Sequence, residues 1–391
     1  MKKRTFCIIL ISAFSAMLGI GIISPFLPEF AEQHGANGFW IGMIFAGFGI
    51  SRGFIMPIVG SVSDKTGRKV FVASGLFLFA VISQFYPLAD SIITLTIVRM
   101  VHGLAAGMIM PMVMAYTAEL AEKGKVGLTT GTLNMVFYLG LAAGPFLGGF
   151  MSQNYGFDSV FHAMSALGLI SFFLVVFFLP ESKGKEPPAR DEVLTFITLI
   201  KYSYVKAVLI GAVAITLMIA VFMSFLPSFA ARINMDPDHV GIIISIGIFL
   251  AGVLQVPFGK LSDRHSTLGK LLQVATGTSI GMFALFVIPM CPDFKALLAA
   301  GAFLGLGAAV SAPALINLSV GIGERVGMGS WMGIFNAAMS VGFVVTPLLS
   351  GVIMDHFGID AVFYLFGIFL FLGILWAAYY IHKRALGYKQ A

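Results

Sequence analysis

The sequence has little charge. Only 11% of its 391 residues are charged and 58% are hydrophobic, whereas about a quarter of a soluble domain is charged. This composition excludes a soluble enzyme domain, a nucleic-acid-binding protein and a disordered chain. The two cysteines, Cys7 and Cys291, lie in apolar stretches without metal-binding spacing. We therefore expect no disulfide framework, no metal site and no cofactor.

Long apolar stretches dominate instead. A helix that crosses a bilayer needs about 20 mostly apolar residues, and the sequence predicts twelve such spans. They cover residues 5–28, 39–61, 70–88, 92–118, 128–152, 158–180, 207–229, 239–259, 270–291, 296–320, 328–354 and 361–381. The predicted fold class is an all-α polytopic membrane protein with twelve transmembrane helices.

The basic residues predict the orientation of the chain. If the N-terminus is inside, all but four of the 24 Lys and Arg residues fall on the inner side. Arg232 and Lys295 fall outside, and Arg52 and Arg99 fall within spans. Because Lys and Arg accumulate in cytoplasmic loops, both termini are expected in the cytoplasm.

The chain also repeats itself. Residues 26–64 match residues 225–263 at an offset of 199, and from the fourth span onward the offset is 202. The matched pairs include Gly60 and Gly259, Asp64 and Asp263, Gly103 and Gly305, Asn134 and Asn336, and Gly156 and Gly358.

This repeat predicts two pseudo-symmetric six-helix bundles. The N-terminal half covers residues 1–180 and the C-terminal half covers residues 207–391, with a charged cytoplasmic linker at 181–206. Halves of this kind place a substrate site between them near the bilayer midplane and rock around it.

Three motifs carry a family resemblance. Gly60-Ser-Val-Ser-Asp64-Lys-Thr-Gly67-Arg68-Lys69 follows the second span, and Gly259-Lys-Leu-Ser-Asp263-Arg264 occupies the matching loop. Residues 140–149 read Gly-Leu-Ala-Ala-Gly-Pro-Phe-Leu-Gly-Gly, and residues 99–107 read Arg-Met-Val-His-Gly-Leu-Ala-Ala-Gly. These segments resemble motifs A, C and B of the major facilitator superfamily, over essentially the whole chain.

Motifs A and C together resemble the twelve-helix drug:proton antiporter group. The resemblance implies a transporter rather than an enzyme. It implies alternating-access efflux of a small amphipathic molecule or drug across the plasma membrane, coupled to protons. The expected partners are a small-molecule substrate, protons and the lipid bilayer, with no nucleic acid, and the chain is expected to act as a monomer.

Motif A predicts a charged latch. Asp64 and Arg68 can form a clamp at the inner face, and Arg68 has candidate acidic partners at the end of the fourth span. The expected gating residues are Asp64, Arg68, Glu119, Glu122, Asp263, Arg264 and Glu324. In the second copy Ser266 and Thr267 stand at the places of Gly67 and Arg68, so that latch should be weaker. The alternative is a loop that only anchors the topology.

Motif C predicts a close helix contact. Gly140, Gly144 and Gly148 recur every four residues, which leaves a flat strip for another helix. Pro145 frees a backbone carbonyl and permits a bend, and Gly149 follows. We interpret this seam as a hinge, and the alternative is an ordinary packing seam.

Carboxylates are missing from membrane depth, because all 18 acidic residues fall in loops or at span ends. Many drug antiporters of the superfamily carry one in the first helix, and residues 5–28 contain none. The charges within spans are basic. Arg52 lies near the middle of its span, where an arginine costs about 2.5–3.5 kcal/mol on insertion scales. It either contacts an anionic substrate, or snorkels or pairs locally.

The first alternative for Arg52 would make the protein a dedicated exporter of an organic anion or lipid-like metabolite. Arg99 is either a structural brace or a coupling element. His102 lies three residues further along the same helix face and is either a proton site or a neutral hydrogen-bonding residue. The expected substrate-binding residues are Arg52, His102, Asn134, Tyr138 and Asn336, and the expected proton-coupling residues are His102 and Arg99.

Overall fold

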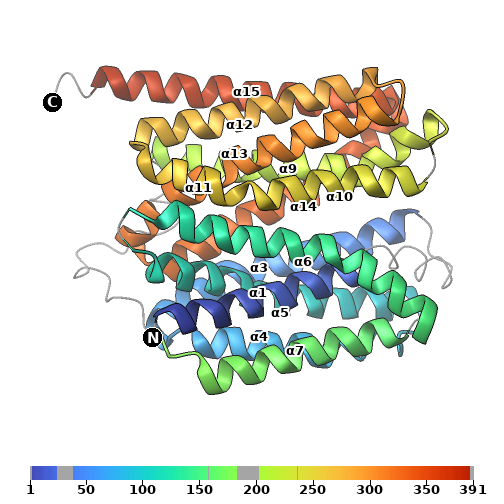
Figure 1. Ribbon diagram of the computed structural model, residues 1–391, viewed down its shortest axis with the longest axis vertical. Coiled ribbons are helices and arrows are strands. Elements are labelled where there is room, and N and C mark those ends of the chain that lie inside the picture. Colours follow the sequence, from blue (N-terminus) through green and yellow to red (C-terminus); the bar gives the residue numbers. More distant parts are fainter. Residues whose placement is uncertain are drawn as a thin grey trace. The chain divides into compact units, whose positions relative to one another are not determined.

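The computed structural model describes residues 2–23, 38–122, 124–156, 158–182, 202–235 and 237–387. Within these residues the secondary structure is helical and no strand occurs, which confirms the all-α prediction. The helices (Figure 1) are α1 (Lys2–Ile23), α3 (Gly38–Thr66), α4 (Lys69–Ser83), α5 (Ile92–Leu120), α6 (Val126–Tyr155), α7 (Asp158–Phe178), α9 (Ser203–Arg232), α10 (Pro237–Val253), α11 (Gln255–Arg264), α12 (Thr267–Val287), the 3-10 turn η1 (Ile288–Met290), α13 (Phe294–Val326), α14 (Met328–Phe357) and α15 (Ile359–Gly387).

Each predicted span overlaps helix in the described residues, although residues 84–88 of the third span lie beyond the end of α4. Residues 24–28 of the first span and residues 183–201 of the predicted linker lie outside the described residues. Among the helices of the described part, nine are long and apolar enough to cross a membrane. The chain is therefore a multi-pass membrane protein.

One predicted span contains a single turn residue. Residues 239–259 fall into α10 and α11, which are separated at Leu254. Pro257 lies at the start of α11 and has no backbone N–H to offer the carbonyl of Val253. The N–H of Leu254 still bonds to the carbonyl of Leu250 (3.1 Å), and that of Phe258 bonds to the carbonyl of Leu254 (3.3 Å). Residues His239–Arg264 therefore still form one stretch that is long and apolar enough to cross a membrane.

The backbone supports the internal repeat. α6 ends at Gly156 and α14 ends at Gly358, which lie 202 residues apart and have φ angles of +84° and +82°. The N–H of Gly156 bonds to the carbonyl of Ser152, and that of Gly358 to the carbonyl of Met354. Glycine is the usual residue for such left-handed helix ends.

The helices form two compact units. Unit 1 consists of Met1–Glu122, Leu133–Ala189 and Gly323–Val344, and unit 2 consists of Lys123–Thr132, Arg190–Ile322 and Val345–Ala391. Each unit thus contains most of one repeat and a segment from the other. The first turns of α6 pack in unit 2, and the first half of α14 packs in unit 1.

Glycines bring α3 and α5 together in unit 1. A Cβ on Gly103 of α5 would overlap the hydroxyl of Ser51 and the carbonyl of Phe48 on α3, so no larger residue fits there. The Ser51 hydroxyl donates a hydrogen bond of 2.7 Å to the carbonyl of Met100. This contact fixes α3, which carries both Arg52 and Asp64.

Candidate functional site

Asp64 lies in the last turn of α3 and binds the first turn of α14 within unit 1. Its carboxylate accepts hydrogen bonds from the backbone N–H groups of Gly329 (2.8 Å) and Ser330 (2.7 Å), and from the Ser330 hydroxyl (2.7 Å). The first N–H groups of a helix have no partner inside it and carry partial positive charge. A carboxylate satisfies both needs, and we call this arrangement the Asp64 clamp (Asp64, Gly329 and Ser330).

The Asp64 clamp requires close contact between two backbones. A Cβ on Gly329 would lie 2.5 Å from the Ser63 hydroxyl and 2.7 Å from the Asp64 carboxylate. A Cβ on Gly60 would overlap the carbonyl of Gly329. Gly60 of motif A and Gly329 of α14 therefore allow α14 to approach α3 closely.

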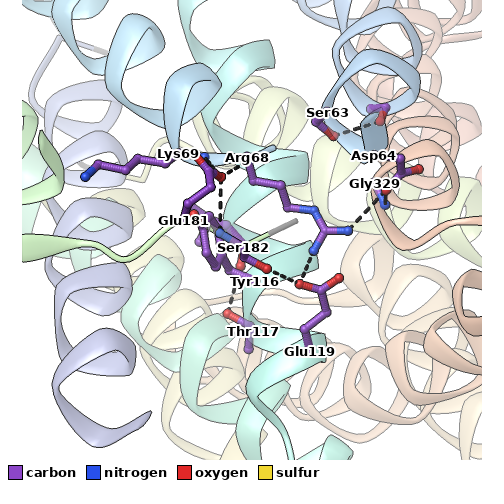
Figure 2. A network of polar contacts seen from close by, with 12 residues as sticks. Ser63, Asp64, Arg68, Lys69, Tyr116, Thr117, Glu119, Glu181, Ser182 and Gly329 are labelled. Atoms are coloured by element: carbon purple, nitrogen blue, oxygen red, sulfur yellow. Dashed lines mark hydrogen bonds and ion pairs between the residues drawn. The ribbon is translucent and has the colours of Figure 1, made fainter. Parts of the chain in front are cut away.

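Arg68 connects the Asp64 clamp to α5. Its side chain is fully buried and donates to Asp64 at 3.1 Å, and it forms an ion pair with Glu119 near the end of α5. The Ser182 hydroxyl donates to the same Glu119 carboxylate. Figure 2 shows the Arg68 guanidinium between the two carboxylates. The pairing of Arg68 with Asp64 and Glu119 agrees with the sequence prediction.

Glu181, which follows α7, binds the first turn of α4 within unit 1. Its carboxylate accepts from the N–H groups of Arg68 (2.8 Å) and Lys69 (3.1 Å). The Tyr116 hydroxyl donates to the carbonyl of Pro180 at 3.1 Å and fixes the preceding residue. Figure 2 shows the Lys69 side chain directed away from this network. Sequence reasoning placed Glu181 and Ser182 in the linker and missed both.

Asp263 repeats the arrangement in unit 2. It accepts from the N–H groups of Gly127 (2.6 Å) and Leu128 (2.8 Å) in the first turn of α6. The Asn317 amide donates to Asp263 at 3.0 Å, and Lys270 donates to the Asn317 carbonyl oxygen at 2.8 Å. We call Asp263, Gly127 and Leu128 the Asp263 clamp.

In the second copy of motif A, the residue that corresponds to Arg68 is Lys270. It lies further along the chain than the loop that matches motif A suggested. The offset of 202 pairs Arg68 with Lys270. This register fits the packing, because Gly75 of α4 lies against the carbonyl of Ala105 and Gly277 of α12 against the carbonyl of Gly307. The cation therefore reaches its carboxylate through an amide in unit 2 and directly in unit 1.

The other expected gating residues lie at helix ends. Glu122 is exposed just after α5, and Arg264 is exposed at the end of α11. Glu324 is exposed in the last turn of α13. Arg264 and Glu324 fall in different units, and the gating roles of all three residues stay predictions.

Motif C packs on α1. A Cβ on Gly144 would lie 2.5 Å from the Cα of Gly21, and one on Gly140 would lie 2.9 Å from the carbonyl oxygen of Phe14. Gly148 is buried. The side chains at Pro145 and Gly149 lie outside the described residues. The seam is a backbone contact between α1 and α6, and its role as a hinge stays a prediction.

Arg99 and His102 lie in an aromatic cage formed by α3, α4, α5 and Tyr86. The Arg99 guanidinium lies 4.6 Å from the ring centroid of Phe48 and contacts the Tyr86 hydroxyl at 3.5 Å. Nδ1 of His102 bonds to the same hydroxyl at 2.8 Å. Phe79 lies edge-on to His102, with ring centroids 4.6 Å apart. His102 is fully buried among these rings.

Arg52 differs from Arg99. It lies in the middle of α3 and is half-buried, and its Nε atom is fully buried without a hydrogen-bond partner among the described residues. The Nε atom of Arg99 is buried without a hydrogen-bond partner as well, but its guanidinium contacts the Tyr86 hydroxyl through another nitrogen. The described residues give the Arg52 side chain no such contact. The substrate-binding role assigned to Arg52 stays a prediction.

The remaining expected binding residues lie on α6 and α14. The Asn336 amide donates to the carbonyl of Met332 at 2.9 Å and contacts the sulfur of Met114 at 3.1 Å. Asn134 is buried and Tyr138 is half-buried. The described contacts join Asn336 to α5 but do not join it to Arg52.

Comparison with known proteins agrees with these features. The family described as Major Facilitator Superfamily matches residues 9–291 and again residues 208–390. The chain belongs to the major facilitator superfamily. It is a membrane transporter and not an enzyme.

Individual relatives support this assignment. An uncharacterized MFS-type transporter of Methanocaldococcus jannaschii is 27% identical over 381 residues, which cover 96% of this chain and 97% of that protein. The quinolone resistance protein NorA of Staphylococcus aureus is 25% identical over 361 residues, which cover 91% of each chain. The crystal structure of the human organic anion transporter MFSD10 (TETRAN) matches with a TM-score of 0.82 at 16% identity, over 96% of this chain and 99% of that chain. This structural match shows the superfamily fold.

Proposed function

We propose that this superfamily member is a proton-coupled exporter of a small amphipathic molecule or drug. It works by alternating access in the plasma membrane, with twelve transmembrane helices in two six-helix bundles. Both termini lie in the cytoplasm, and the monomer is the transporting form. The similarity to NorA, which is named for quinolone resistance, and the motif A and C residues support efflux over uptake.

The observation that carries the proposal is the pair of clamps. Asp64 accepts three hydrogen bonds from the start of α14, and Asp263 accepts two from the start of α6. In each case a carboxylate from the end of one helix holds the N-terminus of a helix from the other repeat. Such contacts hold one access state, and they must be released before α3 and α14, or α11 and α6, can separate.

The proposed proton-coupling residues are His102 and Arg99. The groups facing His102 are the Tyr86 hydroxyl, the Arg99 guanidinium and the rings of Phe48 and Phe79. A histidine changes charge near physiological pH, whereas arginine does not. Protonation of His102 beside Arg99 would place two positive charges in one cage, and their repulsion would disturb the contact of α5 with α3.

A second candidate is a dedicated exporter of an organic anion or lipid-like metabolite bound through Arg52. The lack of a partner for Arg52 among the described residues favours it. The two candidates differ in substrate range and share the transport cycle, the clamps and the coupling ion.

Transport by purified protein in proteoliposomes tests the proposal. An imposed pH gradient should drive accumulation of norfloxacin or ethidium, and nigericin should abolish it. Asp64→Asn should lower the initial rate at least tenfold, because it removes the charge that holds α14. Asp355→Asn is the matched control, since Asp355 is an exposed carboxylate near the other end of α14. Accumulation that ignores the pH gradient would contradict proton coupling, and equal rates for Asp64→Asn and wild type would contradict the latch.

A further inference from the structure

Arg52 is as far from both ends of its helix as a residue can be. α3 spans 29 residues, and Arg52 lies fourteen residues from both Gly38 and Thr66. At a rise of 1.5 Å per residue this is about 21 Å from either end. Long basic side chains near helix ends reach the interface by snorkelling. The side chain of Arg52 is too short to reach the interface from the centre of α3, so its charge stays near the middle of the membrane.

The side chain of Arg52 points toward the interior of unit 1. The outward face of α3 is marked by exposed apolar residues, with Phe54 at 69% exposure between Ile50 and Ile58. Successive helix residues are rotated by about 100°, so Arg52 lies roughly 160° from Phe54. Met56 shares the face of Arg52 one turn further on and is 0% exposed.

The neighbouring helices bound the space that Arg52 faces. Gly49 and Gly53 lie against Val344 and Ser340 of α14, and the carbonyl of Arg52 itself lies against Gly107 of α5. Arg52 therefore projects between the α5 side and the α14 side of α3. The buried residues around Met56 are Met17 of α1 and Met110 of α5, with Ile20, Phe137 and Ala337 packed against them.

Other buried arginines of unit 1 have partners. Arg68 pairs with Asp64 and Glu119, and Arg99 contacts Tyr86 and the ring of Phe48. The Nε atoms of all three arginines are buried without a hydrogen-bond partner among the described residues, so the difference lies in the rest of the guanidinium. None of the described carboxylates pairs with Arg52. A charge that is partly removed from water and has no partner is unfavourable. The described residues supply no such partner, which leaves the Arg52 guanidinium available to an anionic ligand.

The internal repeat shows that only the N-terminal half carries a charge at this position. The offset of 199 pairs Arg52 with Ala251, which is buried and apolar. The two halves therefore do not share a structural need for a cation at this depth. A cation present in only one half is expected if it binds a ligand whose charged group lies at one end.

We propose that Arg52 binds the anionic group of the transported molecule, so that the substrate class is a small organic anion with an apolar body. The planar guanidinium accepts a carboxylate or sulfonate in a bidentate manner, and the methionines one turn away offer adaptable apolar contact. This inference rests on the proposed transport function, because it names the substrate of the same cycle.

Binding by three probes of one shape tests the inference. The probes are 2-naphthoate, neutral 2-naphthamide and cationic 2-naphthylmethylammonium, titrated against protein in zwitterionic nanodiscs. Wild type should bind 2-naphthoate at least tenfold more tightly than the other two. Arg52→Gln should abolish this preference. Arg52→Lys should retain part of it, because lysine keeps the positive charge but cannot donate two parallel hydrogen bonds to a carboxylate. The melting temperature of ligand-free Arg52→Gln should equal or exceed that of wild type, because the variant removes an unpaired charge.

Two results would overturn the inference. One is equal binding of the three probes by wild type and Arg52→Gln. The other is a ligand-free Arg52→Gln that melts well below wild type, which would make Arg52 a structural residue. Proteoliposomes that accumulate ethidium while Arg52 has no effect on 2-naphthoate binding would leave the transport function standing and reject the anion site. Proteoliposomes that move no compound, with Arg52-dependent naphthoate binding intact, would reject the transport proposal alone.

Discussion

Gly67 and Glu181 are in direct contact, and a single added carbon would separate them. A Cβ on Gly67 would lie 2.5 Å from Oε1 of Glu181 and 2.7 Å from its carboxyl carbon. Gly67 also has a φ of +99°, which side chains of L-residues rarely adopt. The motif A glycine thus serves the turn between α3 and α4 and leaves room for the carboxylate that binds the first turn of α4.

Gly67→Ala should therefore destabilise the protein more than backbone strain alone explains. Gly124→Ala is the matched control, since Gly124 has a φ of +78° and no atom within 4 Å of an added Cβ. We expect about 1 kcal/mol from the strained φ in each variant, and at least that much again at Gly67 from the displaced Glu181 carboxylate. Thermal unfolding of the purified variants measures the difference, and equal losses would refute the role of Glu181.

Arg68 and Lys270, the two cations beside the clamps, should contribute differently to the stability of the protein. Arg68 touches both Asp64 and Glu119, whereas Lys270 reaches Asp263 only through Asn317. Arg68→Met removes a buried cation from two partly exposed carboxylates. Breaking a fully buried pair costs about 3–5 kcal/mol, so we expect a loss toward the lower end of that range. Lys270→Met removes one charged hydrogen bond, which costs about 1.5–3 kcal/mol.

Melting temperatures of the two variants measure this difference. The double variant Arg68→Met/Glu119→Gln should recover part of the loss, because it removes an uncompensated charge. A Lys270→Met variant less stable than Arg68→Met would show that the second clamp depends on its cation more than the contacts indicate.

The seam between α1 and α6 should tolerate no side chain. Gly144→Ala places a Cβ 2.5 Å from backbone atoms of Gly21 and Ile22, so the helices must move apart. We expect a loss of about 1–3 kcal/mol, as for overpacked cores. Gly351→Ala on α14 is the control, since nothing lies within 4 Å of its added Cβ. That variant should be neutral or stabilised by roughly 0.5–1 kcal/mol, because alanine favours helix. Equal stability of both variants would contradict the close contact.

The sequence predicts the elements and charged side chains better than it predicts their partners. The apolar spans locate the helices of the described residues, and the spacing of Asp64 and Arg68 predicts their pairing. The partners of the clamps are backbone N–H groups, at Gly329 and Gly127. Such donors exist at the start of every helix and leave no mark in the sequence.

Two further parts of the site need the fold itself. Glu181 meets α4 across more than a hundred residues, and no local pattern distinguishes it from other charges of the linker. Lys270 lies beyond the loop where a copy of Arg68 was expected. It is the fourth residue of α12 and lies seven residues after Asp263, whereas Arg68 lies just before α4 and four residues after Asp64. Asn317 bridges the distance, and its pairing depends on that shift.

Alkylation of a cysteine at position 330 tests the latch most directly. In a Cys7→Ser/Cys291→Ser background, Ser330→Cys places a thiol where the hydroxyl now donates to Asp64, and Thr66→Cys supplies an exposed control on α3. The account predicts slow reaction of residue 330 with N-ethylmaleimide at rest, a severalfold faster reaction under a pH gradient with substrate, and fast reaction at rest when Asp64→Asn is added. A rate that neither transport nor Asp64→Asn changes, while the control reacts normally, would show that the Asp64 clamp does not open during transport.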